Sequence, residues 1–274
     1  MKIAFQGEAG AYSEAAIFQH FGRVSAVPCK TFADVFGAVE TGAVDLGVIP
    51  IENSHAGSIT ENYDLLLERG LFIVDEIYFR VVHCLLANQG AKLEGIKKVC
   101  SHPQALQQCR AFLSQHRFQQ LATSDTAESA RLIKKKGSAN EAAIASELAA
   151  ELYSLVILEK GIETDKENTT RFLVISKNKS SEHHKSSKTS VVFNTKDIPG
   201  ALYNCLGCFA NKGINLTKVE SRPVRHRSWN YLFYLDFVGH IEDELVRGAL
   251  DQLDKYTSFA KVLGSYPSRR NKYK

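Results

Sequence analysis

The sequence predicts an α/β protein built from a larger domain followed by a smaller C-terminal domain. Through the first 176 residues, short runs rich in β-forming residues alternate with helical runs, which is typical of a largely parallel sheet covered by helices. A polar stretch without apolar periodicity follows at 178–188, and a new pattern of strands and helices begins after it. A chain of 274 residues is long enough for two domains.

The larger domain begins with elements that alternate regularly. We expect strands at 2–5, 24–29 and 44–49, and helices at 13–21 and 32–40. A long β-like run at 71–87 comes next, and we expect it to pass from one lobe into another.

Beyond that run the alternation restarts, which predicts a second lobe. The expected strands are 97–100, 118–123, 142–145 and a returning strand at 171–176, and the expected helices are 103–115, 126–136 and one that ends at Tyr153. Two lobes joined by crossing strands leave a cleft, where small ligands usually bind. The predicted domain covers 1–177, with lobes of roughly 1–77 plus 158–177 and 78–157.

Residues 178–188 are predicted to be a linker, and residues 189–274 a second domain. Its expected strands are 189–194, 214–219, 231–238 and 259–265, and its expected helices are 200–211 and 242–253. This βαββαβ order is that of the ferredoxin-like split βαβ unit. Because that unit hosts many functions, the fold alone does not indicate one.

Composition argues against several classes of protein. The formal net charge is only +4, and Lys and Arg are interspersed with Asp and Glu, so nucleic-acid binding is not supported. No window approaches ~18 uninterrupted apolar residues, so we expect no membrane contact. The N-terminal segment is too short in apolar residues for a signal peptide, and six scattered cysteines then favour reduced thiols and a cytoplasmic location. No metal-ligand or nucleotide-binding spacing appears, so we expect no metal and no cofactor.

Polar clusters follow the expected strands of the larger domain. The glycine-rich turn at 7–14 suits either an anionic ligand or a tight turn with Ser13 as helix cap. The segment 50–54 follows a strand and can face a cleft, although an ordinary turn explains it too. The same holds for 101–104, where Ser101 and Gln104 fit a capping box, while Gln108 shares the helix face of Gln104.

Two further clusters contain an arginine. The segment 168–172 precedes the last strand of the larger domain, where Arg171 suits a carboxylate and a neighbouring hydroxyl can donate a hydrogen bond. A strand start with a surface arginine is the alternative. In the smaller domain, Arg222 and the helix start at 199–202 together suit the carboxylate of an amino acid, although Pro and Gly there are also ordinary capping residues.

Together these motifs resemble the prephenate dehydratase family over nearly the whole chain. GxxGxYSE at 7–14, PIENS at 50–54, SHPQALQQC at 101–109 and TTRF at 169–172 occur in the family's order, and GALY at 200–203 and ESRP at 220–223 look like the phenylalanine-binding motifs of its ACT domain. The resemblance implies a two-lobed catalytic domain of the type II periplasmic-binding-protein-like fold and a C-terminal ACT domain. It also implies a lyase that converts prephenate to phenylpyruvate, with loss of water and CO2, in L-phenylalanine biosynthesis.

Family likeness assigns roles to particular residues. The implied catalytic residues are Thr170, Arg171, Asn53, Glu52, Gln108 and Ser101, and the implied substrate contacts are Ser13, Ser54, Thr169 and Phe172. Thr170 would lie beside the leaving hydroxyl, and since threonine is a very poor acid we expect it to act as a hydrogen-bond donor. Arg171 would bind a substrate carboxylate, and the others would orient the substrate.

The resemblance further implies regulation by L-phenylalanine, bound where ACT domains meet in a homodimer or homotetramer. The implied phenylalanine-binding residues are Gly200, Ala201, Leu202, Asn215, Leu216, Glu220, Ser221 and Arg222. A strand is expected at once after Met1, with no chorismate-mutase segment before it, so we expect the monofunctional form.

Other functions stay open. Arogenate dehydratase differs only in the side chain of its substrate, which the sequence does not reveal. A protein of another class, a two-lobed sensor that binds a small molecule without chemistry, needs the cleft but not Thr170 and Arg171 beside Asn53 and Gln108. Phenylalanine can also activate rather than inhibit.

Overall fold

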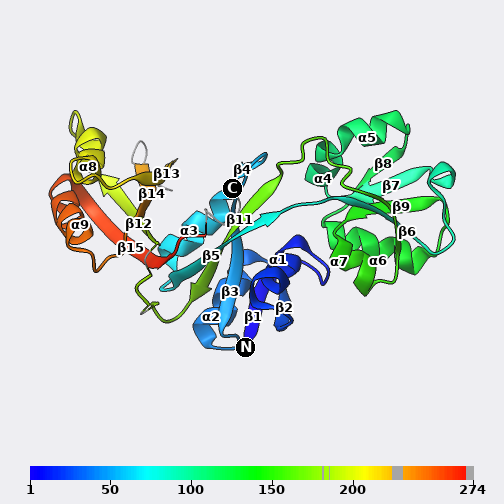
Figure 1. Cartoon of the computed structure of the whole chain (residues 1–274), viewed down its shortest axis with the longest axis horizontal. Coiled ribbons are helices and arrows are strands. Elements are labelled where there is room, and N and C mark those ends of the chain that lie inside the picture. The colour runs from blue at the N-terminus through cyan, green and yellow to red at the C-terminus, as the bar shows by residue number, and fades with distance from the viewer. Residues whose placement is uncertain (181, 185, 224–230, 270–274) are drawn as a thin grey trace. The chain divides into compact units, whose positions relative to one another are not determined.

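A computed structural model describes residues 1–180, 182–184, 186–223 and 231–269 (Figure 1). It divides into two compact units, the first formed by Met1–Tyr63 with Ile77–Phe172 and the second by Asp64–Glu76 with Leu173–Lys274. The domain limits expected from the sequence stay a prediction, and residues 181 and 185 of the expected linker lie outside the described residues.

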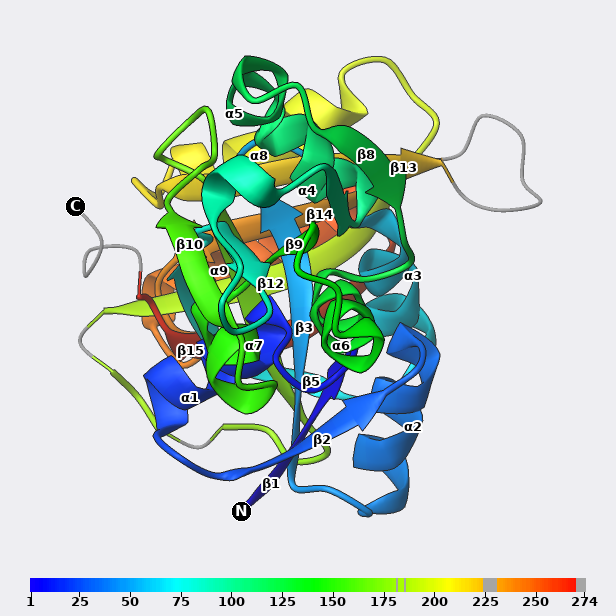
Figure 2. The ribbon, with the colours of Figure 1, turned by 90° about the vertical axis from the view of Figure 1, so that its right-hand side faces the viewer.

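The first lobe is built on a six-stranded sheet of order β2-β1-β3-β11-β5, with β4 paired to β3. Its elements are β1 (Lys2–Gln6), α1 (Tyr12–Phe21), β2 (Ser25–Cys29), α2 (Phe32–Thr41), β3 (Leu46–Asn53), β4 (Gly57–Ser58), α3 (Thr60–Glu68), β5 (Phe72–Arg80) and β11 (Thr169–Ser176). β1 pairs in parallel with both β2 and β3. In Figure 2, α1 and α2 flank β1 on opposite sides. β5 and β11 carry the chain from one unit to the other.

The second lobe is a five-stranded sheet of order β10-β6-β9-β7-β8. Its elements are β6 (Cys84–Ala87), the 3₁₀ turn Leu93–Gly95, β7 (Lys98–Ser101), α4 (Pro103–Gln108), α5 (Arg110–Gln115), β8 (Gln119–Ala122), α6 (Thr126–Lys136), β9 (Glu141–Ala145), α7 (Glu147–Leu152) and β10 (Val156–Lys160). Side chains alternate along β9, so Ala142 and Ile144 pack with α4 and α5, while Ala143 and Ala145 pack with α6 and α7. Helices therefore cover both faces of this sheet.

The C-terminal part of the second unit is a four-stranded antiparallel sheet of order β13-β14-β12-β15 with two helices. Its elements are β12 (Ser187–Thr195), α8 (Ala201–Ala210), β13 (Leu216–Pro223), β14 (Tyr231–Val238), α9 (Glu244–Tyr256) and β15 (Thr257–Pro267). Val191 and Phe193 of β12 pack with Phe209 of α8 and Leu253 of α9 in one core. Both helices therefore cover the same face of the sheet (Figure 1).

The predicted fold class is confirmed, and the differences lie at element boundaries and in a few elements that were not expected. The expected run at 71–87 forms two strands, β5 and β6, because the residues Val81–His83 between them belong to no strand. The expected helix at 103–115 breaks at Cys109, whose φ of −98° and ψ of 15° end α4. The expected capping box of Ser101 and Gln104 is wrong: His102 is the cap, and its side chain accepts from the Gln104 N–H at 3.2 Å. α3 and β10 were not predicted.

Candidate active site

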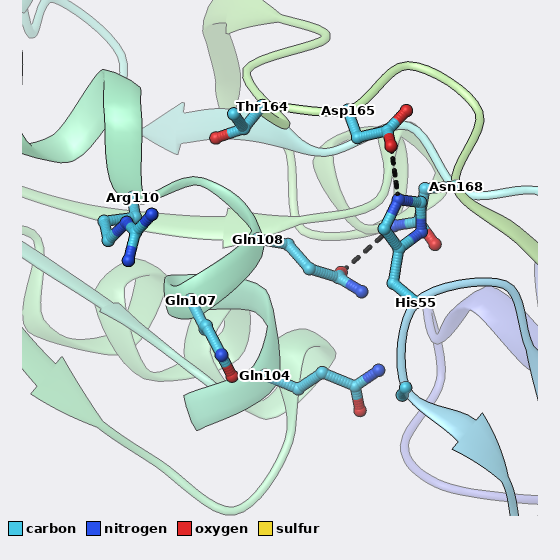
Figure 3. Close-up of a pocket in the computed structure, with 9 residues that line it drawn as sticks. His55, Gln104, Gln107, Gln108, Arg110, Thr164, Asp165 and Asn168 are labelled. Carbon is cyan, nitrogen blue, oxygen red and sulfur yellow. Dashed lines mark hydrogen bonds and ion pairs between the residues drawn. The ribbon is translucent and has the colours of Figure 1, made fainter.

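Two cavities in the first unit share Gln104 and Gln108. We call one the Thr170 cavity, lined by Tyr12, Ser13, Pro50, Asn53, Ile59, Val81, His83, His102, Gln104, Ala105, Gln108, Thr126, Thr170 and Phe172. We call the other the Arg110 cavity, lined by His55, Ala56, Gln104, Gln107, Gln108, Arg110, Thr164, Asp165 and Asn168 (Figure 3). The first combines polar groups with an apolar wall, and the residues that line the second are polar apart from Ala56.

Strand alternation decides which residues of the TTRF segment face the Thr170 cavity. Successive side chains of a strand point to opposite faces, so Thr170 and Phe172 share a face and Arg171 takes the other. Thr170 and Phe172 line the cavity. Arg171 is only 4% exposed, and its guanidinium pairs with the Glu52 carboxylate at 3.1 Å. The geometry thus places a hydroxyl in the cavity and an ion pair on the opposite face.

Asn53 sets the direction of the Thr170 hydroxyl. The Asn53 Oδ1 accepts the backbone N–H groups of His55 and Ala56, both at 3.0 Å. Its Nδ2 must therefore be the donor, and it donates to Thr170 Oγ1 at 2.9 Å. Since the Thr170 oxygen accepts this bond, its own proton is left to donate into the cavity.

A chain of hydrogen bonds extends from Asn53 through the site. Asn53 Nδ2 also donates to Asn168 Oδ1 at 2.8 Å, and Asn168 Nδ2 donates to Gln108 Oε1 at 3.0 Å. The same Gln108 oxygen lies 2.7 Å from His83 Nε2, and His83 Nδ1 lies 2.7 Å from the Tyr12 hydroxyl. We call this set of six side chains the relay.

His83 is the titratable centre of the relay, and it is only 2% exposed. Burial lowers the pKa of its imidazole, against the opposing effects of the Gln108 hydrogen bond and the Glu163 charge. Burial likewise raises the pKa of the Tyr12 phenol well above its ordinary value. Glu163 binds the backbone N–H of His83 at 2.9 Å rather than its ring. The relay is therefore neutral at pH 7.

The structure brings together only some of the residues singled out in the sequence. Ser13, Asn53, Gln108, Thr170 and Phe172 line the Thr170 cavity. Ser101 is fully buried, and its Oγ donates to the Ile144 carbonyl at 2.7 Å. Ser101, Glu52, Arg171, Ser54 and Thr169 line neither cavity.

Several residues of the site were missed in the sequence. Tyr12, His83 and Asn168 complete the relay, and Arg110 and His55 line the second cavity. A usable signal existed for His83, because it interrupts an apolar run. No such signal existed for Arg110, because a single arginine on a helix is not distinctive.

A serine, a histidine and an aspartate contact one another beside the Arg110 cavity, whose wall includes the histidine and the aspartate but not the serine, although the sequence contains no motif for them. Ser54 Oγ lies 2.9 Å from His55 Nδ1, and His55 Nε2 lies 2.8 Å from Asp165 Oδ2. The Glu167 backbone N–H and His55 hold the pKa of Asp165 below its usual value. Ser54 Oγ also accepts the Thr169 N–H at 3.0 Å and lies 3.1 Å from the Glu167 carbonyl.

The glycine-rich turn is held against α7 through Gly10. The Gly10 N–H donates to the Glu14 carboxylate at 2.6 Å, and the Gly10 carbonyl accepts from Ser146 Oγ at 2.5 Å. Gly10 has a φ of +90°, and a Cβ there would lie 3.0 Å from the Cα of Ala149. This position thus needs glycine for close approach to α7. The alternative of Ser13 as cap is wrong, because Ala11 is the N-cap and makes no side-chain bond.

The residues proposed for phenylalanine binding lie on two elements of the second unit. Gly200 is the N-cap of α8 with a φ of +77°, and Ala201 and Leu202 follow it. Asn215 precedes β13, whose residues include Leu216, Glu220, Ser221 and Arg222. Arg222 pairs with Asp64 at 3.2 Å, and its buried Nε has no hydrogen-bond partner among the described residues.

Within the described ranges, no cluster of His, Cys, Asp or Glu has the geometry of a metal site. In the same part of the chain, no helix is long and apolar enough to cross a membrane.

Fold and cavities define a class, a two-lobed α/β protein with two cavities lined by many polar residues. Comparison with known proteins specifies it further. The family model described as prephenate dehydratase matches residues 3–180, so the chain belongs to the prephenate dehydratase family. It is accordingly a lyase-type enzyme of the group that contains prephenate and arogenate dehydratases.

The individual relatives include dehydratases and one protein described as an acylase. The chain is 44% identical over 277 residues to arogenate dehydratase/prephenate dehydratase 2, chloroplastic, of Arabidopsis thaliana, covering 97% of this chain and 73% of that protein. A solved prephenate dehydratase from Arthrobacter aurescens in complex with L-Phe is 32% identical, with a TM-score of 0.90 over 98% of this chain and 91% of that chain. Another solved structure, GqqA, a novel type of quorum-quenching acylase, is 36% identical, with a TM-score of 0.93 over 99% of this chain and 100% of that chain.

Proposed function

We propose that the protein is a prephenate dehydratase that forms phenylpyruvate for phenylalanine biosynthesis and is inhibited by L-phenylalanine. The observation that carries the proposal is the Thr170 hydroxyl, turned by Asn53 to donate into a cavity with an apolar wall. In this reaction the bond to the ring carboxylate breaks as CO2 leaves, and its electrons enter the ring as the C–O bond breaks. The departing oxygen needs a hydrogen-bond donor, and Thr170 supplies one.

The walls of the two cavities suit the two parts of prephenate. Ile59, Val81 and Phe172 offer apolar contacts for the ring. Arg110 of the second cavity has no ion pair with a carboxylate among the described residues, so it is the cation we assign to the side-chain carboxylate. The role predicted for Arg171 fits less well, because its guanidinium is buried against Glu52.

The test is a direct assay of the purified protein on prephenate and on arogenate in parallel. Phenylpyruvate formed from prephenate supports the proposal. Preference for arogenate would retain the site and change the substrate, and no turnover of either compound would leave a protein that binds without chemistry. An Arg110→Met variant should raise KM for the preferred substrate, while Arg131→Met, an exposed arginine outside both cavities, should not.

Regulation by phenylalanine belongs to the same proposal. The solved relative with bound L-Phe supports it, as does the buried Nε of Arg222, a donor suited to an amino-acid carboxylate. Adding L-phenylalanine to the assay measures the effect directly. We expect inhibition, with a sigmoidal dependence of rate on substrate concentration. If phenylalanine has no effect at any concentration, the regulatory part of the proposal is rejected.

A second candidate function is hydrolysis of an acyl amide. It is favoured by the contacts joining Ser54, His55 and Asp165, together with the similarity to the solved acylase. Water would be added across the amide bond to release an acid and an amine. Free acid released from an N-acyl amide, and its loss in Ser54→Ala, would support this activity. Release that persists in the variant would exclude Ser54 as nucleophile.

A further inference from the structure

Hydrogen positions in the relay follow from two backbone N–H groups. Those of His55 and Ala56 make Asn53 Oδ1 an acceptor, so Asn53 Nδ2 donates to Asn168 Oδ1. The remaining end of the Asn168 amide is then a donor, which makes Gln108 Oε1 an acceptor. Every amide of the relay thus has one allowed orientation.

The same logic fixes the imidazole. Gln108 Oε1 can only accept, so His83 Nε2 must carry a hydrogen to make the 2.7 Å contact. In a neutral ring the other nitrogen then holds a lone pair, and the Tyr12 hydroxyl donates to it. Gln108 therefore selects the tautomer of His83, Tyr12 supplies the donor to its Nδ1, and His83 is the second donor that holds the Gln108 oxygen.

Orienting Gln108 has an effect in the cavity. Because Oε1 is bound by both Asn168 and His83, the NH2 group of the Gln108 amide points away from them, and no described residue accepts a hydrogen bond from it. Gln108 lines both cavities, so this NH2 group is a hydrogen-bond donor available to a ligand.

We propose that His83, with its tautomer set by Gln108 and its Nδ1 bound by Tyr12, is a positioning residue for the dehydration: its Nε2–H holds Gln108 so that the Gln108 NH2 group faces the substrate and the Asn168 and Asn53 amides keep their orientation toward Thr170. This role rests on the proposed function for its effect on turnover, but not for the tautomer.

The surroundings of His83 favour the neutral ring. Tyr12 meets it edge-on, with ring centroids 5.4 Å apart and planes at 83°. Glu163 is the charged group that acts on His83, and it binds the backbone N–H rather than the ring. The ionisable groups that act on Tyr12 are Cys84, Cys109, Glu163 and Asp125. A histidine that merely filled the core would need neither nitrogen in a particular state, and this difference can be tested.

The kinetic test compares His83→Gln with His83→Leu. Glutamine keeps an N–H donor for Gln108, whereas leucine fills the space without one. We expect His83→Leu to lower kcat about tenfold, equivalent to about 1.4 kcal/mol, and His83→Gln to stay within roughly threefold of the parent. His116→Leu, outside both cavities, is the control for losing a partly buried imidazole. Equal kcat in the glutamine and leucine variants would overturn the proposal.

The spectroscopic test needs no activity. In side-chain ¹⁵N spectra of histidine-labelled protein at pH 7, the resonances lost in His83→Gln should show a protonated Nε2 and an unprotonated Nδ1. Gln108→Leu, which removes the acceptor from Nε2, should populate the other tautomer, with Nδ1 donating to Tyr12. A protonated Nδ1 in the parent protein would refute the proposal even if dehydratase activity is found. If the protein has the expected tautomer but turns over neither prephenate nor arogenate, only the proposed function is rejected.

Discussion

The surroundings of Thr170 in the first unit and of Lys188 in the second unit contain buried polar groups of opposite kinds. Around Thr170 the first unit uses amides, an imidazole and hydroxyls, all neutral at pH 7. The second unit buries full charges: Lys188 and Glu76 are 1% and 0% exposed, with the ammonium 2.7 and 2.8 Å from the two carboxylate oxygens. Neutral groups fix the direction of a hydrogen bond without a strong field, whereas an ion pair holds segments together but is costly to break.

The charged centre ties three segments of the second unit together. Glu76 and Asp75 lie on β5, Lys188 lies on β12, and Arg269 follows β15. Arg269 donates its backbone N–H to Glu76 at 2.9 Å and pairs its guanidinium with Asp75 at 2.9 Å. β5 continues into the first unit, so these contacts bind a strand whose residues are divided between the two units.

The largest effect should come from breaking the charged centre. Lys188→Met leaves the Glu76 carboxylate buried without its ammonium partner and should lower the free energy of unfolding by about 3–5 kcal/mol. Urea denaturation followed by circular dichroism measures this. Lys188→Met combined with Glu76→Leu should recover most of the loss, and a double variant as unstable as the single one would contradict this account.

Breaking the neutral centre should cost turnover instead of stability. Thr170→Ala removes the donor to the leaving oxygen and should lower kcat by about 10²–10³, while Tm changes little. Thr170→Ser keeps the hydroxyl and should retain most of the activity. A small loss of kcat in Thr170→Ala, with the fold intact, would show that Thr170 does not assist the leaving group.

Arg222 tests whether charge in the second unit also serves a ligand. Arg222→Ala should raise the phenylalanine concentration needed for inhibition by about 10–100-fold, since a hydrogen bond to a charged group contributes roughly 1.5–3 kcal/mol. Asp64→Asn breaks the same ion pair but keeps the guanidinium, so it should have a smaller effect. Inhibition curves at fixed substrate distinguish the two, and identical shifts would mean that only the ion pair matters.

The smallest effect concerns pH. Because burial lowers the pKa of His83, the unfolded chain binds a proton below about pH 6.5 that the folded chain does not. Stability from this group is therefore complete above that pH and decreases as pH falls, by at most about 1.4 kcal/mol per pH unit. Thermal unfolding of His83→Gln between pH 7 and 5 should show a shallower decline than the parent. An identical slope would mean that His83 is not buried as the neutral form.

Periodicity predicted most of the fold, because each strand and helix is a local pattern. It missed α3 and β10, whose segments lack a clear apolar rhythm, and it joined β5 to β6 across Val81–His83. The site was harder. Asn53, Gln108 and Thr170 were identified by their motif, but strand alternation turns Arg171 away from the cavity that its neighbours line. Tyr12 and His83 meet across 71 residues of chain, and no pattern in the sequence records that contact.

The backbone hydrogen bond from Ser54, directly after β3, to Thr169 of β11 also affects the chemical stability of Asn53. Asparagine side chains deamidate when the backbone nitrogen of the next residue attacks the amide carbon, and Asn53 is followed by serine, a small residue that permits this attack. Here the Ser54 nitrogen donates its hydrogen to the Thr169 carbonyl at 2.9 Å, within a paired backbone that resists the required rotation. An aspartate at position 53 would accept a proton from Thr170 instead of donating one. The backbone pairing beside Asn53 thus also slows the loss of the nitrogen that orients the Thr170 hydroxyl.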